Sequence, residues 1–247
     1  MNNKIKLDRE KETLLIPLYG KAVESRKKIS VLLDHKALEI VKKIDYDFES
    51  LHFPAKTNTM MCLRAKLMDN YVKGFLKKNK GCTVLHLGCG LDSRSVRIDD
   101  PETDWYDLDY KEVIDIRRYF FPEADNYHLI PSSVTAPGWI ERIPAGKEHY
   151  LVVAEGLFMY LKESEIINLL SSIKQRIGHY TLIFDAYSYL RPGEQKIILL
   201  LKKPVRRFNG ELTIRKSSPG GIRELNRWIQ FISARMKRSK NWDLEQN

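Results

Sequence analysis

The feature that most constrains the fold is a glycine turn placed directly after a short apolar run. The run, residues 83–87, reads T-V-L-H-L, and its length and apolar content predict a buried strand. The turn that follows is Gly88-Cys89-Gly90. Glycine permits backbone angles that other residues avoid, and its missing side chain lets a ligand lie against the chain. A strand that ends in such a turn is typical of the ligand-binding edge of a parallel sheet.

The residues after the turn complete a nucleoside-binding pattern. Asp92 and Ser93 favour the start of a helix, and residues 105–108 predict a second strand that ends at Asp109. The carboxylate of Asp109 can accept hydrogen bonds from both hydroxyls of a ribose. Because the third glycine of the dinucleotide fingerprint is missing, a ligand without a pyrophosphate fits better than NAD. The alternative is a tight turn that only joins a core strand to a helix.

Composition indicates one α/β domain with additions. The 247 residues are 43% hydrophobic, which is enough for one sizeable core. No apolar run is long enough to predict a membrane span, and the charged N-terminus does not resemble a secretory signal. Three cysteines, Cys62, Cys82 and Cys89, show neither a disulfide framework nor a metal spacing. They suit a reducing cytoplasm, which is the expected location.

The net charge of +10 is concentrated in the tail. Residues 191–247 hold 14 Lys and Arg against 5 Asp and Glu, a net charge of +9. The nearly neutral remainder shows no aromatic-basic interleaving that would mark a nucleic-acid module. We therefore do not expect nucleic acid as a partner of this part. A basic tail that binds nucleic acid or another acidic surface stays open as an alternative.

Helices are predicted before the first strand, and helices alternate with strands after it. Residues 1–50 show no strand signal; their first helix is expected to break at Pro17 and Gly20, and residues 36–44 predict another. A further helix, residues 59–78, carries apolar side chains on one side. These are Met60, Leu63, Leu67, Tyr71 and Phe75. Strands at 127–130, 150–154 and 180–184 alternate with helices, which predicts a parallel sheet covered on both faces.

Two charged residues outside the glycine unit are candidates for a site. Glu155 follows the apolar run 150–154, so it lies where open α/β sheets bind ligands. It could hold an ammonium group or act as a base, or it could be an acid that stabilises a helix N-terminus. Arg64 could clamp a carboxylate, or it could be a solvated helix charge. The six histidines are scattered and are read as structural.

Five segments, in order along the chain, resemble the leucine carboxyl methyltransferase family. They are L-H-L-G-C-G-L-D-S-R, W-Y-D-L-D-Y-K-E-V-I-D-I-R-R-Y-F-F-P, Y-H-L-I-P-S-S-V, V-V-A-E-G-L-F-M-Y-L and F-D-A-Y-S. The resemblance covers about residues 12 to 188 and is greatest to the bacterial branch of tetracenomycin-type polyketide O-methyltransferases. It implies a seven-stranded Rossmann-like sheet, S-adenosylmethionine as cofactor, and a small-molecule carboxylate or hydroxyl, such as a polyketide, as methyl acceptor.

The resemblance also assigns cofactor-binding roles. They fall on Arg64 for the methionine carboxylate, Gly88 and Gly90 against the cofactor, Asp109 for the ribose hydroxyls, Ser133 and Val134 beside the adenine, and Glu155 at the methionine amino end. No metal is expected, and the catalytic residue is left unassigned. If the acceptor is a phenol, Tyr160 and Glu155 are weak candidates for a base.

The chain is expected to divide into a helical cap (1–80), an S-adenosylmethionine-binding core (81–188) and an atypical basic tail (189–247). Family members complete the sheet with antiparallel strands, whereas this tail departs from them. Read from the third base of each codon with permitted codon choices, Lys196 through Ser217 give N-H-P-S-F-K-K-T-G-A-A-I-Q-W-G-I-D-D-P-E-E-L, which resembles the family's own ending.

We therefore hypothesise a frameshift shortly after Ser188, which would cost the sheet its last strands and leave a parallel edge uncovered. A catalytically impaired remnant or binding protein that keeps the fold is the alternative function, and a divergent substrate lid is the alternative explanation of the tail.

Resequencing the gene across the codons for residues 185–220 tests the frameshift. We expect codons that spell the family-like string in the shifted frame, because two bases of each shifted codon are already nearly fixed by the residues present. An intact frame whose codons do not spell this string would rule the frameshift out.

Overall fold

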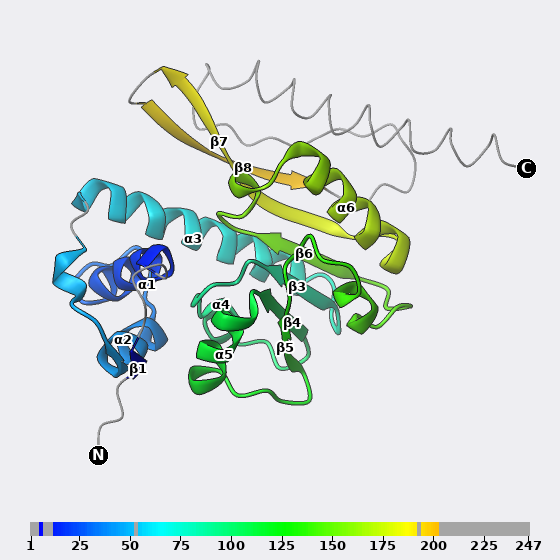
Figure 1. The fold of residues 1–247 in the computed structure, drawn as a ribbon, viewed down its shortest axis with the longest axis horizontal. Coiled ribbons are helices and arrows are strands. Elements are labelled where there is room, and N and C mark those ends of the chain that lie inside the picture. Colours follow the sequence, from blue (N-terminus) through cyan, green and yellow to red (C-terminus); the bar gives the residue numbers. More distant parts are fainter. Residues whose placement is uncertain (1–4, 7–11, 52–53, 192–193, 203–247) are drawn as a thin grey trace, which may run out of the picture.

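The computed structural model describes residues 5–6, 12–51, 54–191 and 194–202, with side chains described within 14–51 and 54–185. Its centre is a six-stranded sheet with the order β5-β4-β3-β6-β7-β8 (Figure 1). The strands are β3 (Thr83–Leu87), β4 (Asp104–Asp109), β5 (Tyr127–Pro131), β6 (Tyr150–Ala154), β7 (Thr181–Arg191) and β8 (Glu194–Lys202). All neighbours are parallel except β7 and β8. The predicted parallel sheet of an α/β fold is confirmed.

The strand order reverses between β3 and β6. From β3 the chain proceeds outward through β4 to β5, and then returns to the other side of β3 to form β6 and β7. The carboxyl ends of strands that diverge in this way leave a crevice for a ligand. Both the glycine turn after β3 and Glu155 after β6 therefore lie at this switch point.

Helices cover both faces of the sheet. Helix α3 (Ala55–Leu76) packs Met68, Val72 and Leu76 against Val84 and Val153. On the opposite face lie α6 (Glu163–Ile177) and the 3-10 helix η3 (Trp139–Arg142). The remaining helices after β3 are α4 (Arg94–Ile98), α5 (Lys111–Phe120) and the 3-10 helix η4 (Phe158–Tyr160). Among the helices of the described residues, none has the length and apolarity to cross a membrane.

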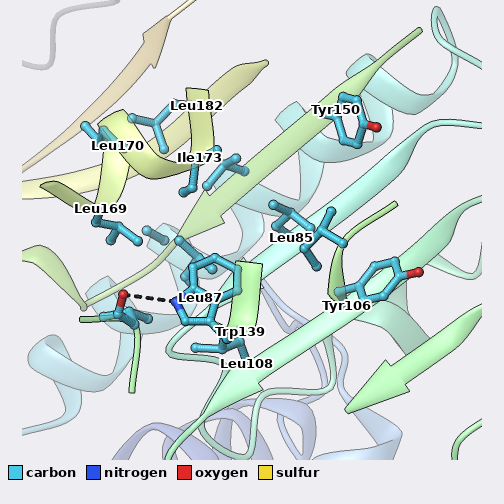
Figure 2. Close-up of a cluster of buried hydrophobic side chains, with 14 of the residues drawn as sticks. Leu85, Leu87, Tyr106, Leu108, Trp139, Tyr150, Leu169, Leu170, Ile173 and Leu182 are labelled. Carbon is cyan, nitrogen blue, oxygen red and sulfur yellow. Dashed lines mark hydrogen bonds between the residues drawn. The ribbon is translucent and has the colours of Figure 1, made fainter. Parts of the chain in front are cut away.

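The largest hydrophobic cluster lies between the sheet and α6. Leu85 and Leu87 of β3 face Leu169, Leu170 and Ile173 of α6 (Figure 2). Because β3 lies in the middle of the sheet, all five of its residues are buried, which explains its near-continuous apolar sequence. Trp139 belongs to this cluster, and its indole nitrogen donates a hydrogen bond of 3.2 Å to a main-chain carbonyl.

The N-terminal helices differ from prediction in two ways. Helix α1 (Glu12–Ser25) runs through Pro17 and Gly20 without a break, so the predicted interruption is wrong. A tertiary contact supports the continuous helix, since the side-chain amide of Asn58 in α3 donates a hydrogen bond of 3.1 Å to the Gly20 carbonyl. The second difference is a short parallel pair, β1 (Ile5–Lys6) with β2 (Ile44–Asp45), where no strand was expected. Helix α2 (His35–Lys43) matches its prediction and precedes the 3-10 helix η2 (Phe48–Ser50).

The predicted apolar side of α3 packs against the core only towards the end of the helix, where Tyr71 and Phe75 are partly buried beside the cluster that contains Val84. Met60, Leu63 and Leu67 are 38–44% exposed. The residues of α3 that are buried instead comprise Asn58, Cys62, Arg64, Ala65, Met68, Asp69, Val72 and Leu76. Apolar residues occupy both sides of this helix, and the small Cys62 and Ala65 allow close packing on the buried one.

The sheet continues beyond the predicted last strand. Strand β7 extends to Arg191 instead of ending near Phe184, and β8 pairs with it antiparallel from Glu194 to Lys202. The expectation that the β7 edge stays uncovered is therefore wrong, because β8 supplies its backbone partners. Most of the tail, residues 203–247, lies outside the described residues.

Candidate functional site

The glycine turn has the geometry that its sequence predicts. Gly88 and Gly90 have φ angles of 62° and 52°, in the left-handed region that favours glycine. A Cβ atom at Gly88 would lie 3.0 Å from Cδ1 of Leu157, which follows β6. Strands β3 and β6 therefore bring their two following loops into contact at the switch point, and a side chain at Gly88 would separate them.

Asp109 lies at the carboxyl end of β4, beside this turn. Its Oδ2 accepts a hydrogen bond of 2.7 Å from the Gly90 amide, and its Oδ1 accepts one of 2.8 Å from the Tyr110 amide. Burial raises the pKa of Asp109, while these two amides act in the opposite direction. Each carboxylate oxygen has lone-pair capacity for a second donor, so the group fits a pair of ribose hydroxyls.

Arg64, Glu155 and Asp185 meet near the carboxyl end of β6, on the other side of β3 from Asp109. Nε of Arg64 donates to Oε1 of Glu155 at 2.9 Å, and Nη1 donates to Oδ2 of Asp185 at 3.1 Å. The Gly156 amide donates to the other Asp185 oxygen at 2.6 Å. A guanidinium beside two carboxylates offers partners for both ends of an amino-acid zwitterion. The donor set therefore fits the methionine end of S-adenosylmethionine.

Ser133 and Val134 follow β5, whose Pro131 pairs in register with Asp109. Ser133 is half-buried, and its hydroxyl lies 2.9 Å from that of Thr135. Val134 is buried, and its carbonyl accepts the hydrogen bond from Trp139. The two residues thus lie along the same sheet edge as Asp109, without a hydrogen bond to Arg64 or Glu155.

The structure adds charged residues that the sequence did not identify. Arg94 is fully buried and donates both to Glu155 and, at 2.8 Å, to Asp69. Lys21 of α1 forms an ion pair of 3.1 Å with Asp92. We use the name crevice charge network for the connected ion pairs of Lys21, Asp34, Arg64, Asp69, Asp92, Arg94, Arg97, Glu155 and Asp185.

Of these additions, only Asp185 had a usable sequence signal. It follows an apolar run as Glu155 does, although β7 continues past it. Lys21 and Arg94 lie in helices, where a charged residue normally indicates solvent exposure, and they are distant in sequence from Asp92 and Glu155, with which they respectively pair.

Burial and charge act in opposite directions on Glu155. Burial alone would raise its pKa, but the positive charges of Arg64, Arg94 and Lys21 outweigh burial and lower the pKa to about 2. Glu155 is therefore ionised at neutral pH and binds protons weakly. This environment suits a group that holds a cation better than a general base, whose pKa should lie near the working pH.

The surroundings of His86 and of the three cysteines indicate structural roles for these side chains. Nε2 of His86 lies 3.1 Å from Arg94 Nη1, which can only donate, so Nδ1 carries the ring proton and donates to Asp107 at 2.9 Å. Burial raises the pKa of Cys62 and Cys82 to about 11. All three cysteines are free and buried. Within the described ranges, no group of three or more His, Cys, Asp or Glu is arranged to hold a metal ion.

The structure thus combines a mostly parallel sheet, a glycine turn, a carboxylate at the end of the neighbouring strand and a cluster of buried charges at its switch point. The family model of leucine carboxyl methyltransferase matches residues 17–174. The chain belongs to the leucine carboxyl methyltransferase family. It is an S-adenosylmethionine-dependent methyltransferase.

Two relatives, TcmP and dpfgK, agree with this assignment. Tetracenomycin polyketide synthesis O-methyltransferase TcmP of Streptomyces glaucescens is 37% identical over 187 residues, which cover 75% of this chain and 69% of TcmP. The S-adenosyl-L-methionine-dependent methyltransferase dpfgK of Gibberella zeae is 28% identical, and the alignment covers 94% of this chain and 83% of dpfgK. Among solved structures, the methyltransferase domain of bacterial CtHen1 has a TM-score of 0.42 at 16% identity, covering 68% of this chain and 83% of that chain.

The low pKa of Glu155 predicts a pH-dependent contribution to stability. Its pKa is lower in the folded chain than its ordinary value of 4.5, so the stabilisation is complete above pH 4.5 and is lost as the pH falls toward 2. At pH 7 we expect Glu155→Gln to lower the free energy of unfolding by about 3 kcal/mol. Below about pH 4.5 the difference from the parent should shrink. Urea unfolding between pH 7 and pH 3.5 measures both quantities.

Glu102→Gln is the matched control, because Glu102 pairs with Lys80 at the surface, where both side chains are more than half exposed. We expect it to change the free energy of unfolding by less than about 0.5 kcal/mol at any pH. A Glu155→Gln effect of constant size across this pH range would contradict the assigned ionisation of Glu155.

Proposed function

We propose that this chain is an O-methyltransferase of small organic molecules, with a polyketide-like acid or phenol as its acceptor. The support for the acceptor class is the 37% identity to TcmP, whose name places it in tetracenomycin polyketide synthesis. S-adenosylmethionine would supply an electrophilic methyl group: the acceptor oxygen forms a bond to the methyl carbon in line as the bond from that carbon to the sulfonium breaks, and S-adenosylhomocysteine leaves.

In this proposal, Asp109 binds the ribose hydroxyls, while Gly88 and Gly90 leave room for the nucleoside. Arg64 binds the methionine carboxylate. Glu155, together with Asp185, binds the ammonium group. Ser133 and Val134 border the adenine. The distances around Asp109 and Arg64 support these roles, since both groups are held in place by hydrogen bonds before a ligand arrives.

A carboxylate acceptor fits the site better than a neutral hydroxyl. Glu155 has a pKa of about 2 and hydrogen bonds to two arginines, so it is a poor base. Tyr160, the other candidate, is 73% exposed on η4. A carboxylate is already ionised at neutral pH and needs no base. Holding it opposite the methyl group can by itself lower the barrier, by up to about 7–11 kcal/mol in good model systems.

We further propose the division into a cap (1–80), a cofactor-binding core (81–188) and an atypical tail (189–247), and a cytoplasmic location. The three free, buried cysteines support a reducing compartment. The alternative function, an impaired remnant that binds cofactor without turnover, is supported by the family-like string in the shifted frame of the tail.

Replacing Asp109 should remove cofactor-dependent stabilisation. With S-adenosylhomocysteine at about a hundredfold over its dissociation constant, we expect the parent to gain about 2.7 kcal/mol. This corresponds to about 5–10 °C in the unfolding midpoint. Asp109→Asn should lose most of this shift, because the uncharged amide replaces one acceptor oxygen. Asp104→Asn, at the start of the same strand, is the control and should keep it. An equal shift in Asp109→Asn would contradict the ribose-binding role.

Methyl transfer can be tested with 1-hydroxy-2-naphthoic acid, which presents a carboxylate and a phenol on fused aromatic rings. With methyl-labelled S-adenosylmethionine, we expect labelled product whose label is released as methanol by alkali, since an ester is hydrolysed and an aryl ether is not. Alkali-stable product would show hydroxyl methylation and contradict the carboxylate preference.

The same assay distinguishes an active enzyme from an impaired remnant. It compares the present chain with a second chain that carries the shifted-frame string from residue 196 onward. Turnover by the present chain supports the proposed function. Turnover by the restored chain alone would establish the remnant. If both chains bind S-adenosylhomocysteine and neither transfers the label, this acceptor class is excluded.

A further inference from the structure

A fully buried carboxylate lies behind the glycine turn. Asp107 is two residues before Asp109 on β4, so the two side chains project from the same face of the sheet. Oδ1 of Asp107 accepts hydrogen bonds from His86 Nδ1 and Trp105 Nε1, at 2.9 Å each. Oδ2 of Asp107 accepts hydrogen bonds from Arg117 Nη2 and from the Tyr127 hydroxyl. With four donors from four residues, this carboxylate is held in one place.

Arg117 connects this fixed carboxylate to the glycine turn. Its side chain is fully buried, and its guanidinium carbon lies 4.3 Å from the centre of the Phe121 ring. While Nη2 is bound to Asp107, Nη1 donates to the carbonyls of Gly90 and Asp92 at 2.8 Å each. The planar guanidinium therefore holds the turn at a fixed distance from β4.

Gly90 is held through both of its peptide groups. Its carbonyl accepts from Arg117 at 2.8 Å, and its amide donates to Asp109 at 2.7 Å. The peptide that carries the Gly90 amide is also held on its other side, because the Cys89 carbonyl accepts from the Asp92 amide at 3.0 Å. Arg117 therefore holds the two carbonyls that flank this part of the turn, those of Gly90 and Asp92, while the Gly90 amide donates one of the two hydrogen bonds that orient Asp109.

We propose that Arg117 is a positioning residue of the cofactor site. By holding the Gly90 and Asp92 carbonyls from behind, it fixes the Gly90 amide and thereby orients the carboxylate with which Asp109 binds ribose. The proposal rests on the ribose-binding role of Asp109. Arg117 itself lies behind the turn, so its effect is transmitted through the turn and not through direct contact with a ligand.

The test compares two ligands, S-adenosylhomocysteine and its 2′-deoxy analogue, by calorimetric titration. A carboxylate that accepts from the 2′-hydroxyl should make the parent prefer the ribose ligand by about tenfold or more. In the double variant Arg117→Met with Asp107→Asn, we expect this ratio to fall toward 1. The double variant removes both charges of the buried pair, so neither charge is left unpaired.

The ratio separates positioning from general stability. A variant whose fold is merely weakened binds both ligands less well and keeps the ratio of the parent. Arg117→Lys gives a second measurement: it keeps a charge beside Asp107 but lacks the planar fork, and its ratio should also fall. Arg118→Met is the control, because Arg118 is the exposed neighbour on α5 that pairs with Glu123, and its ratio should equal that of the parent.

Two results would overturn the proposal, and they can be told apart. An unchanged ratio in folded Arg117→Lys and in the double variant would show that Asp109 is oriented without Arg117. A ratio near 1 in the parent itself would instead remove the ribose-binding role of Asp109, and the proposal would fail with it.

Discussion

The structure depends on the mutual neutralisation of charges that are buried at the switch point of the sheet. The crevice charge network holds four positive and five negative side chains, each at most 10% exposed. Burying one such charge alone is costly, so each side chain requires its partners. The partners come from α1, the residue before α2, α3, the segment after the glycine turn, α4, the loop after β6, and β7. The N-terminal helices are therefore tied to the sheet by ion pairs as well as by apolar packing.

Local patterns explain what the sequence could predict. The unit from β3 to β4 was predictable because each step, an apolar run, a glycine turn and a strand ending in Asp109, is encoded within a few neighbouring residues. The helix expected between the strands at 150–154 and 180–184 is α6, whose apolar residues follow one helical period. Glu155 was identified from its place after a buried strand, a rule that rests on the geometry of parallel sheets.

The features that the sequence did not predict depend on contacts between distant segments. The buried side of α3 could not be chosen, because Met60 and Leu63 on the exposed side are as apolar as Met68 on the buried side. The burial of Arg94 follows from carboxylates 25 and 61 residues away in sequence. The continuity of α1 depends in part on Asn58, which donates to it across the α1–α3 interface.

The same interactions explain how the site proposed for the cofactor can fold before a ligand arrives. Arg64 is neutralised by Glu155 and Asp185, which are the groups that an amino-acid ligand would engage. A carboxylate and an ammonium group can replace these internal partners with chemically equivalent ones, so the number of satisfied charges is the same in both states. Because the charged groups already lie together, such a ligand would exchange partners among them without drawing further charged residues into the site.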